Sequence, residues 1–176
     1  MQIHSDPHST SSFRKGLFPK VLVSIVLIVV LGTASGLITS GSIGGWYQSI
    51  KKPFFTPPNW IFGPAWLLLY TLMGITFGRL WQLATKNRYP IIRNYAAKGM
   101  WIFGVHFIFN LAWTPVFFGL HATGVALVII LIMLGLILFM IKHYWRIDRI
   151  ASFLLVPYAL WVTFATLLNL SIWWLN

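Results

Sequence analysis

The run GVALVIILIMLGLILFMIKH, from Gly124 to His143, decides the class of fold, because no charged residue occurs in it before Lys142. A run of this length and composition can cross the hydrocarbon core of a bilayer as one helix. The chain has four other long apolar runs, at roughly residues 21–40, 63–84, 100–120 and 150–175. Because lipid offers no hydrogen-bond partner to free backbone groups, these runs predict an all-α integral membrane protein, a bundle of five transmembrane helices.

The composition of the whole chain agrees with the lipid bilayer as its main partner. Its 176 residues are 58% hydrophobic and 9% charged, whereas soluble domains carry about a quarter charged residues. The net charge of +11 comes from cations that lie between the apolar runs rather than on a soluble face, which argues against nucleic-acid binding. Cysteine is absent, and Asp148 is the one acid near the membrane, which disfavours thiolate metal sites, carboxylate dyads and proton relays.

The chain divides into a basic tail, residues 1–20, which we predict to be disordered, and a transmembrane domain, residues 21–176. We expect helices at residues 21–41, 63–84, 99–120, 123–144 and 150–174, and a proline- and aromatic-rich loop at residues 42–62. All cations except Lys51 and Lys52 fall on the side of the tail. This bias predicts a cytoplasmic N-terminus and a C-terminus outside.

The first helix contains the pair Gly32 and Gly36, with the GxxxG spacing that lets two helices approach closely. Two arrangements use such a pair equally well: packing inside the bundle, or a homodimer. The sequence favours neither.

Four prolines fall within twelve residues of the loop and the start of the second helix, interleaved with aromatic residues. Because proline fixes the backbone, this stretch should form a stiff cap that leads into the second helix. An aromatic belt at the membrane interface would explain one or two tryptophans, but it explains the proline pattern less well. We therefore predict that the stretch from Trp46 to Trp60 is a lid over a binding site.

Two helices present polar and aromatic side chains along one face each. They are His106, Asn110, Trp113 and Phe117 in the third helix, and Trp161, Ala165 and Asn169 in the fifth. The predicted topology brings these faces and Trp66 to similar depth beneath the cap. This arrangement predicts an apolar pocket for a large, flat hydrophobic ligand. The candidate ligand-binding residues are Trp46, Tyr47, Pro57, Trp60, Phe62, Trp66, Tyr70, His106, Asn110, Trp113, Phe117, Tyr158, Trp161, Ala165 and Asn169.

The histidines do not predict a metal site. His106, His121 and His143 fall at different depths of the predicted bundle, so they cannot pair across one haem iron. We expect His106 to pack or to form a hydrogen bond.

Three ordered blocks of residues resemble the translocator protein / tryptophan-rich sensory protein (TspO/MBR) family, over roughly residues 22–174. The blocks are Trp46-Tyr47-x4-Lys52-Pro53-x3-Pro57-Pro58-x-Trp60-x-Phe62-x-Pro64-x-Trp66-x3-Tyr70, Asn110-x2-Trp113-x-Pro115-x-Phe117-Phe118-Gly119 and Pro157-Tyr158-x2-Trp161-x2-Phe164-Ala165-x3-Asn169. The resemblance implies a five-helix bundle, often dimeric, that binds protoporphyrin IX, haem-type tetrapyrroles and other large apolar ligands beneath the first loop. It implies a sensor or regulator of tetrapyrrole metabolism or stress response, with porphyrin as ligand and no required cofactor.

Two other functions stay open under the resemblance. Some bacterial relatives have been proposed to degrade protoporphyrin IX in light through two pocket tryptophans, which correspond to Trp66 and Trp161 here. No acid–base or metal catalytic site is visible in the sequence, so an enzyme of this kind would depend on indole photochemistry. The third function is transport of porphyrin or another apolar solute, for which the sequence shows neither a nucleotide site nor an intramembrane carboxylate.

The chain departs from the family pattern in two places. His106 stands where the second block normally has Gln, which would make a polar contact of the pocket sensitive to pH. The cholesterol motif of mammalian members is absent, because no Lys or Arg follows Arg149, and this argues against sterol binding. Together with the charge bias and the short C-terminus, this absence predicts a bacterial inner membrane.

Overall fold

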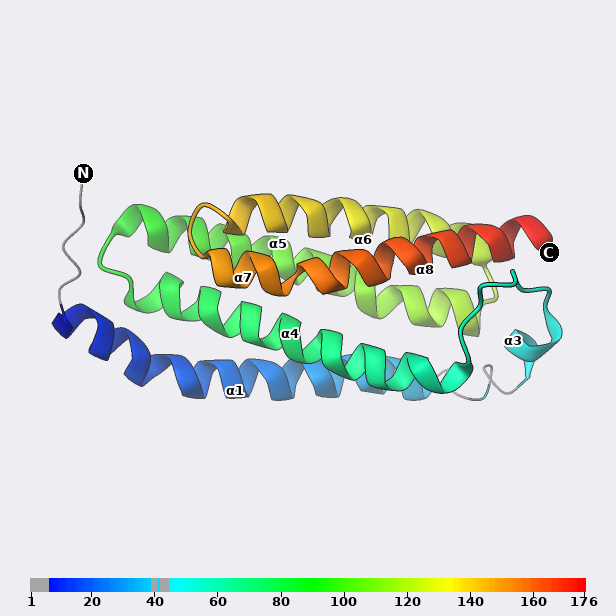
Figure 1. The fold of residues 1–176 in the computed structure, drawn as a ribbon, viewed down its shortest axis with the longest axis horizontal. Helices are drawn as coiled ribbons and strands as arrows, with labels where there is room; N and C mark the ends of the chain where they lie inside the picture. The colour runs from blue at the N-terminus through cyan, green and yellow to red at the C-terminus, as the bar shows by residue number, and fades with distance from the viewer. Residues whose placement is uncertain (1–6, 39–40, 42–44) are drawn as a thin grey trace.

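A computed structural model of the protein describes residues 7–38, 41 and 45–176, and its regular segments are helices (Figure 1). In chain order they are α1 (Pro7–Ile38), α3 (Trp46–Ser49), α4 (Asn59–Lys86), α5 (Pro90–Thr114), the π-helical turn η1 (Pro115–Gly119), α6 (Thr123–Tyr144), α7 (Arg149–Leu154) and α8 (Val156–Leu175). Five segments of the described chain are long and apolar enough to cross a membrane: Gly16–Leu37, Asn59–Lys86, Pro90–Gly119, Thr123–Tyr144 and Arg149–Leu175. The predicted class of fold is confirmed.

The helices lie side by side in an elongated bundle, with α3 and the C-terminus at one end and the start of α1 at the other (Figure 1). Helix α4 packs against α1, α5 and α7, while α6 packs against α5 and α8. In contrast, the backbones of α4 and α8 rarely come close, and these two helices meet through long side chains. The bundle is therefore closed at the end near α7 and looser at the end near α3.

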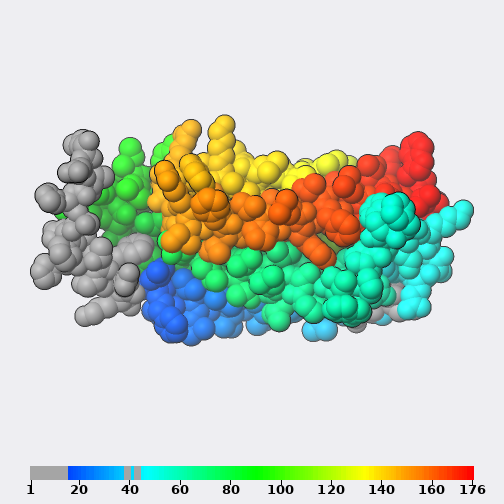
Figure 2. All heavy atoms as spheres, in the orientation of Figure 1, coloured from blue at the N-terminus to red at the C-terminus, as the bar shows by residue number. Residues whose placement is uncertain are grey.

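The segment at residues 45–58, which we call the cap segment, contains α3 and leads into α4. In Figure 2 its cyan spheres lie against the red end of α8. Hydrogen bonds make this contact: the side chain of Asn176 accepts from the backbone N–H of Lys51 and donates to its C=O, each at 3.0 Å. The cap segment is thus attached to α8, which is distant in sequence.

Three helix starts differ by four residues or more from the sequence-based expectations. The predicted disordered tail is wrong for residues 7–20, which form the first turns of α1, while residues 1–6 lie outside the described part. Helix α5 begins at Pro90 rather than residue 99, and α1 begins at Pro7, because the first position of a helix tolerates proline, whose missing N–H would be unpaired there anyway. Helix α4 begins at Asn59 rather than residue 63, inside the predicted loop.

Glycines bring α1 and α4 together. A Cβ atom on Gly74 or Gly78 would lie 2.5 Å from the Cα of Ile25 or Val21, so the two backbones touch without side chains between them. A Cβ on Gly32 would lie 2.4 Å from the ring of Tyr70. The first glycine of the GxxxG pair therefore packs within the chain, and the homodimer stays a prediction.

An ion pair joins α4 to the start of α7 at the end of the bundle opposite the cap segment. Arg79 donates from Nε and Nη2 to the two carboxylate oxygens of Asp148, at 2.8 and 3.0 Å. The Asp148 side chain is 7% exposed and also accepts from the backbone N–H of Ala151, which caps α7. One carboxylate thus fixes both a helix start and a helix–helix contact.

Candidate ligand-binding cavity

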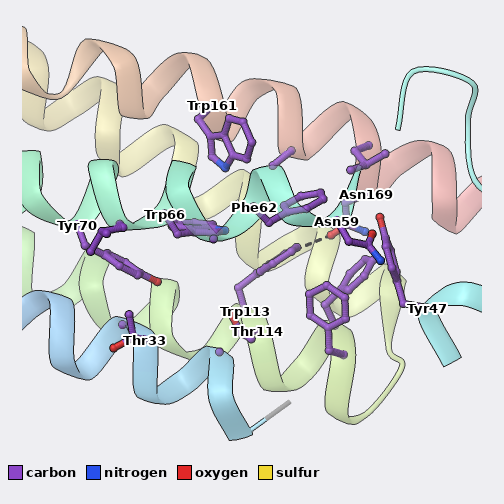
Figure 3. Close-up of a pocket in the computed structure, with 18 of the residues that line it drawn as sticks. Thr33, Tyr47, Asn59, Phe62, Trp66, Tyr70, Trp113, Thr114, Trp161 and Asn169 are labelled. Atoms are coloured by element: carbon purple, nitrogen blue, oxygen red, sulfur yellow. Dashed lines mark hydrogen bonds between the residues drawn. The ribbon is translucent and has the colours of Figure 1, made fainter. Parts of the chain in front are cut away.

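A cavity of about 350 Å³ lies between α1, α4, α5 with η1, and α8, in the half of the bundle nearest α3 (Figure 3). This volume falls within the range of small-molecule sites. Nine of the fifteen candidate residues line it: Tyr47, Phe62, Trp66, Tyr70, Trp113, Phe117, Trp161, Ala165 and Asn169. The structure therefore brings most of the predicted residues of the second, third and fifth membrane spans to one space.

The walls of the cavity consist largely of flat aromatic rings. Trp66 stacks on Tyr70 with ring centroids 5.2 Å apart, and Trp113 stacks on Phe117 at 5.1 Å. Phe62 meets Trp161 edge-on at 6.0 Å. Figure 3 shows Trp66, Trp113 and Trp161 on three different helices around the same space. Such surfaces suit a planar apolar ligand, because aromatic rings stack on it or meet its edge.

Helix α1 supplies a wall of the cavity that the sequence did not predict. Its contribution consists of Gly32, Thr33, Gly36 and Leu37. The GxxxG pair was the sequence signal for this wall. Its glycines permit close helix packing, and they also leave room beside the helix. Asn59 and Thr114 also line this space. Nothing in the local sequence pattern distinguishes either residue.

Six candidate residues do not line the cavity: Trp46, Pro57, Trp60, His106, Asn110 and Tyr158. Trp60 is 73% exposed at the start of α4. Trp46 instead stacks on the imidazole of His121, with centroids 4.2 Å apart, and so attaches α3 to the loop after η1. The other buried members lie beneath the cavity.

A hydrogen-bonded network joins three helices beneath the cavity. The hydroxyl of Tyr70 donates to Oδ1 of Asn110 at 3.3 Å, and Nδ2 of Asn110 donates to the hydroxyl of Tyr158 at 2.9 Å. That hydroxyl lies 2.9 Å from Nε2 of His106. All four side chains are at most 5% exposed. The sequence allows two roles for Asn110, contact with another helix or with a ligand, and the structure shows the helix contact.

A second polar link lies at the opposite end of the cavity. The indole N–H of Trp113 donates to Oδ1 of Asn169 at 3.2 Å, as the dashed line in Figure 3 shows. Nδ2 of Asn169 in turn donates to the backbone C=O of Thr123 at 2.8 Å. These bonds fix the ring of Trp113 at the cavity wall and connect α5, α6 and α8.

The cap segment closes the cavity with Tyr47. Its side chain is 3% exposed and packs edge-on against Phe117 and Phe118, with centroids 6.3 and 5.4 Å apart. Burial raises the pKa of the Tyr47 hydroxyl, so the phenol stays neutral. The ammonium group of Lys52 lies over the same ring, 4.7 Å from its centroid. A cation therefore stands beside the cavity on the side of the cap segment.

Among the described residues, no group of three or more His, Cys, Asp or Glu side chains is placed to hold a metal ion. What the cavity offers is flat apolar surface, a few hydrogen-bonding groups and a nearby cation. These features suit binding of an apolar ring system.

The chain is similar to known proteins over the region that contains the membrane spans and the cavity. A model of the TspO/MBR family matches residues 24–175. The chain is 40% identical over 144 residues to Protein CrtK of Rhodobacter capsulatus, which covers 81% of this chain and 84% of that protein. It is 36% identical to the tryptophan-rich protein TspO of Archaeoglobus fulgidus, over 89% of this chain and 97% of that protein. It is 31% identical to the translocator protein of Homo sapiens, over 73% of each chain.

Proposed function

The chain belongs to the TspO/MBR family, and from this premise and the geometry of the cavity we propose that it binds porphyrins and other large apolar ligands within the membrane. In this role it acts as a sensor or regulator of tetrapyrrole metabolism or of a stress response. The single observation that carries the proposal is the cavity bounded by the indoles of Trp66, Trp113 and Trp161. The charge bias supports a topology with the cap segment on the outer side of a bacterial inner membrane.

The surroundings of Tyr47 support a ligand with an acidic edge. Protoporphyrin IX is a flat apolar macrocycle with two carboxylates on one side. Lys52 is held over Tyr47, whose ring lines the cavity, so a carboxylate at the cap segment would meet a cation there. The macrocycle would then lie between the aromatic walls, out of water.

Light-dependent porphyrin breakdown is a second candidate, which one observation favours. Trp66 and Trp161 both line the cavity, so a bound ligand would contact two indoles that can be oxidised. In the described part of the chain, no His, Asp, Glu, Lys or Arg side chain lines the cavity. Illumination of the complex distinguishes this candidate: porphyrin absorbance should disappear faster than in the free ligand.

Binding is tested by titrating protoporphyrin IX into the purified protein while following tryptophan fluorescence. We expect saturable quenching that is strongly reduced in the double variant Trp66→Phe plus Trp161→Phe. A matched control replaces Trp101 and Trp174, which are 75% and 82% exposed, by Phe. Absent saturation in the wild type, or equal loss of quenching in the two double variants, would contradict the proposal.

A further inference from the structure

Beneath the cavity lies a pair of side chains that ligand binding does not require, Tyr158 and His106. Both are 0% exposed, and neither lines the cavity. The hydroxyl of Tyr158 is 2.9 Å from Nε2 of His106. The ring of Tyr158 also meets the indole of Trp66 at 6.4 Å between centroids, in an edge-on arrangement. The pair thus lies directly behind a cavity wall.

The other partners of Tyr158 fix the direction of its hydrogen bond to His106. Asn110 donates to the Tyr158 oxygen from Nδ2, and its Oδ1 accepts from Tyr70, so the amide orientation fits both tyrosines. Among the described residues, the acceptor for the proton of Tyr158 is therefore Nε2 of His106. A neutral imidazole that accepts at Nε2 carries its own proton on Nδ1, a buried atom to which the described residues offer no hydrogen-bond partner.

Two tyrosines contact Trp66, and they differ in what receives their proton. Tyr70 donates to an amide oxygen, which is not a base in water near neutral pH. Tyr158 donates to an imidazole nitrogen, the most frequent proton acceptor among protein side chains. A phenol that loses an electron becomes strongly acidic and must lose its proton as well. Of the two, Tyr158 alone has a base in place for that step.

We propose that Tyr158 and His106 form a redox-active pair that takes oxidising equivalents from Trp66. The proposal rests on the proposed function, because the oxidant is a light-excited porphyrin in the cavity whose electron passes to dioxygen or an added acceptor. Trp66, after losing one electron to the oxidised ligand, regains one from Tyr158. The phenolic proton moves along the existing hydrogen bond to Nε2 of His106.

The products of this step are a neutral indole, a neutral tyrosyl radical and an imidazolium ion. One electron and one proton have moved, and the positive charge has shifted from Trp66 to His106. Because no further charge is created in the apolar interior, the step avoids the free energy that a new buried charge would cost.

Because Tyr158 and His106 lie behind the cavity wall, transfer of the radical from Trp66 to Tyr158 affects the cavity itself. Trp66 lines the cavity and an indole radical there is exposed to ligand and dioxygen, whereas Tyr158 lies behind the wall. Transfer to Tyr158 therefore restores the cavity surface and keeps the radical away from the ligand. When the radical is reduced, the proton returns from His106 along the same bond.

The experiment uses the full-length protein in lipid nanodiscs, loaded with protoporphyrin IX in the dark. Quenching of tryptophan fluorescence first establishes binding. A light flash in the presence of a cobalt(III) pentaammine acceptor then generates radicals, which are followed by transient absorption and by electron paramagnetic resonance. We expect a tryptophan radical that converts to a tyrosyl radical, more slowly in D2O, with a spectrum that narrows after ring-deuteration of tyrosine.

Three variants identify the residues. Tyr158→Phe should abolish the tyrosyl radical and prolong the tryptophan radical, whereas Tyr144→Phe, which removes a fully buried hydroxyl that bonds to the C=O of Gly99 away from the cavity, should leave the radical in place. His106→Gln keeps a polar side chain but removes the base, so conversion should slow by on the order of a hundredfold. Circular dichroism and the unfolding midpoint establish that each variant is folded.

Distinct results contradict the pair and the proposed function. A tyrosyl radical that persists in Tyr158→Phe, or forms at an unchanged rate in folded His106→Gln, would overturn the pair. So would a wild-type protein that binds porphyrin and forms a tryptophan radical but no tyrosyl radical. If the wild type shows no quenching in the dark, the proposed function fails. Azide radicals from pulse radiolysis then oxidise the indoles without a ligand, and absence of a Tyr158-dependent radical would contradict the pair.

Discussion

Replacing Asn176 by Ala should loosen the cap segment and speed ligand dissociation about fivefold. The Asn176 side chain forms two hydrogen bonds with the backbone of Lys51, each 3.0 Å long. Because both residues are exposed, each bond contributes about 0.5 kcal/mol, the lower end of the usual range. Loss of both destabilises the attached cap segment by about 1 kcal/mol, which corresponds to about a fivefold change in rate where cap opening limits release.

The assay is stopped-flow fluorescence of the protein in nanodiscs, in which bound protoporphyrin IX is displaced into an excess of empty lipid vesicles. Lys51→Gln is the matched control, because the two bonds use the backbone of Lys51 and survive the loss of its ammonium group. We expect the control to release ligand at the wild-type rate. A dissociation rate for Asn176→Ala within twofold of wild type, or an equal acceleration in both variants, would refute the attachment.

Three further predictions concern the cavity and the ion pair. Lys52→Gln should weaken binding of protoporphyrin IX by about two- to fivefold, because the ammonium group on the cap segment is only partly buried. Binding of the dimethyl ester, which has no carboxylate, should stay unchanged in fluorescence titrations. Ala165→Leu fills space beside Trp161 and should weaken porphyrin binding by about five- to a hundredfold at unchanged helix content. Asp148→Asn retains a capping side chain but leaves Arg79, whose side chain is 19% exposed, without its anion. The free energy of unfolding should therefore fall by about 1–3 kcal/mol in denaturant titrations, while the affinity for porphyrin stays unchanged.

The five spans could be predicted from the sequence because hydrophobicity over about 20 residues reports directly on the bilayer. The beginnings of α1 and α5 could not, because the segments after Pro7 and Pro90 contain charged and polar residues, and hydropathy does not distinguish an extended helix from a loop there. The sequence signal for these two helix starts is proline, which is common at the first position of a helix.

The aromatic wall of the cavity could be predicted from helical spacing, because residues four apart share one face. Spacing gave no depth of burial, so it could not separate Phe117, which lines the cavity, from His106 and Asn110, which share its face but bond to Tyr158 beneath it. Whether a residue lines the cavity or lies beneath it depends on the side chain opposite it in the bundle. For Asn110 that side chain is Tyr158, about 50 positions away in the sequence.

Glycine explains why the bundle is closed at one end and hollow at the other. Val21 faces Gly78 and Ile25 faces Gly74, and each contact brings the α1 backbone against α4. In the same antiparallel register Gly36 lies level with Gly63, at the end near the cap segment. Apart from the neighbouring backbone of its own helix, no heavy atom of the described residues lies within 4 Å of where a Cβ on either glycine would be, and both glycines line the cavity. Glycine thus lets α1 and α4 meet where the residue opposite it has a side chain. It leaves room for a ligand where the residue opposite it is also glycine.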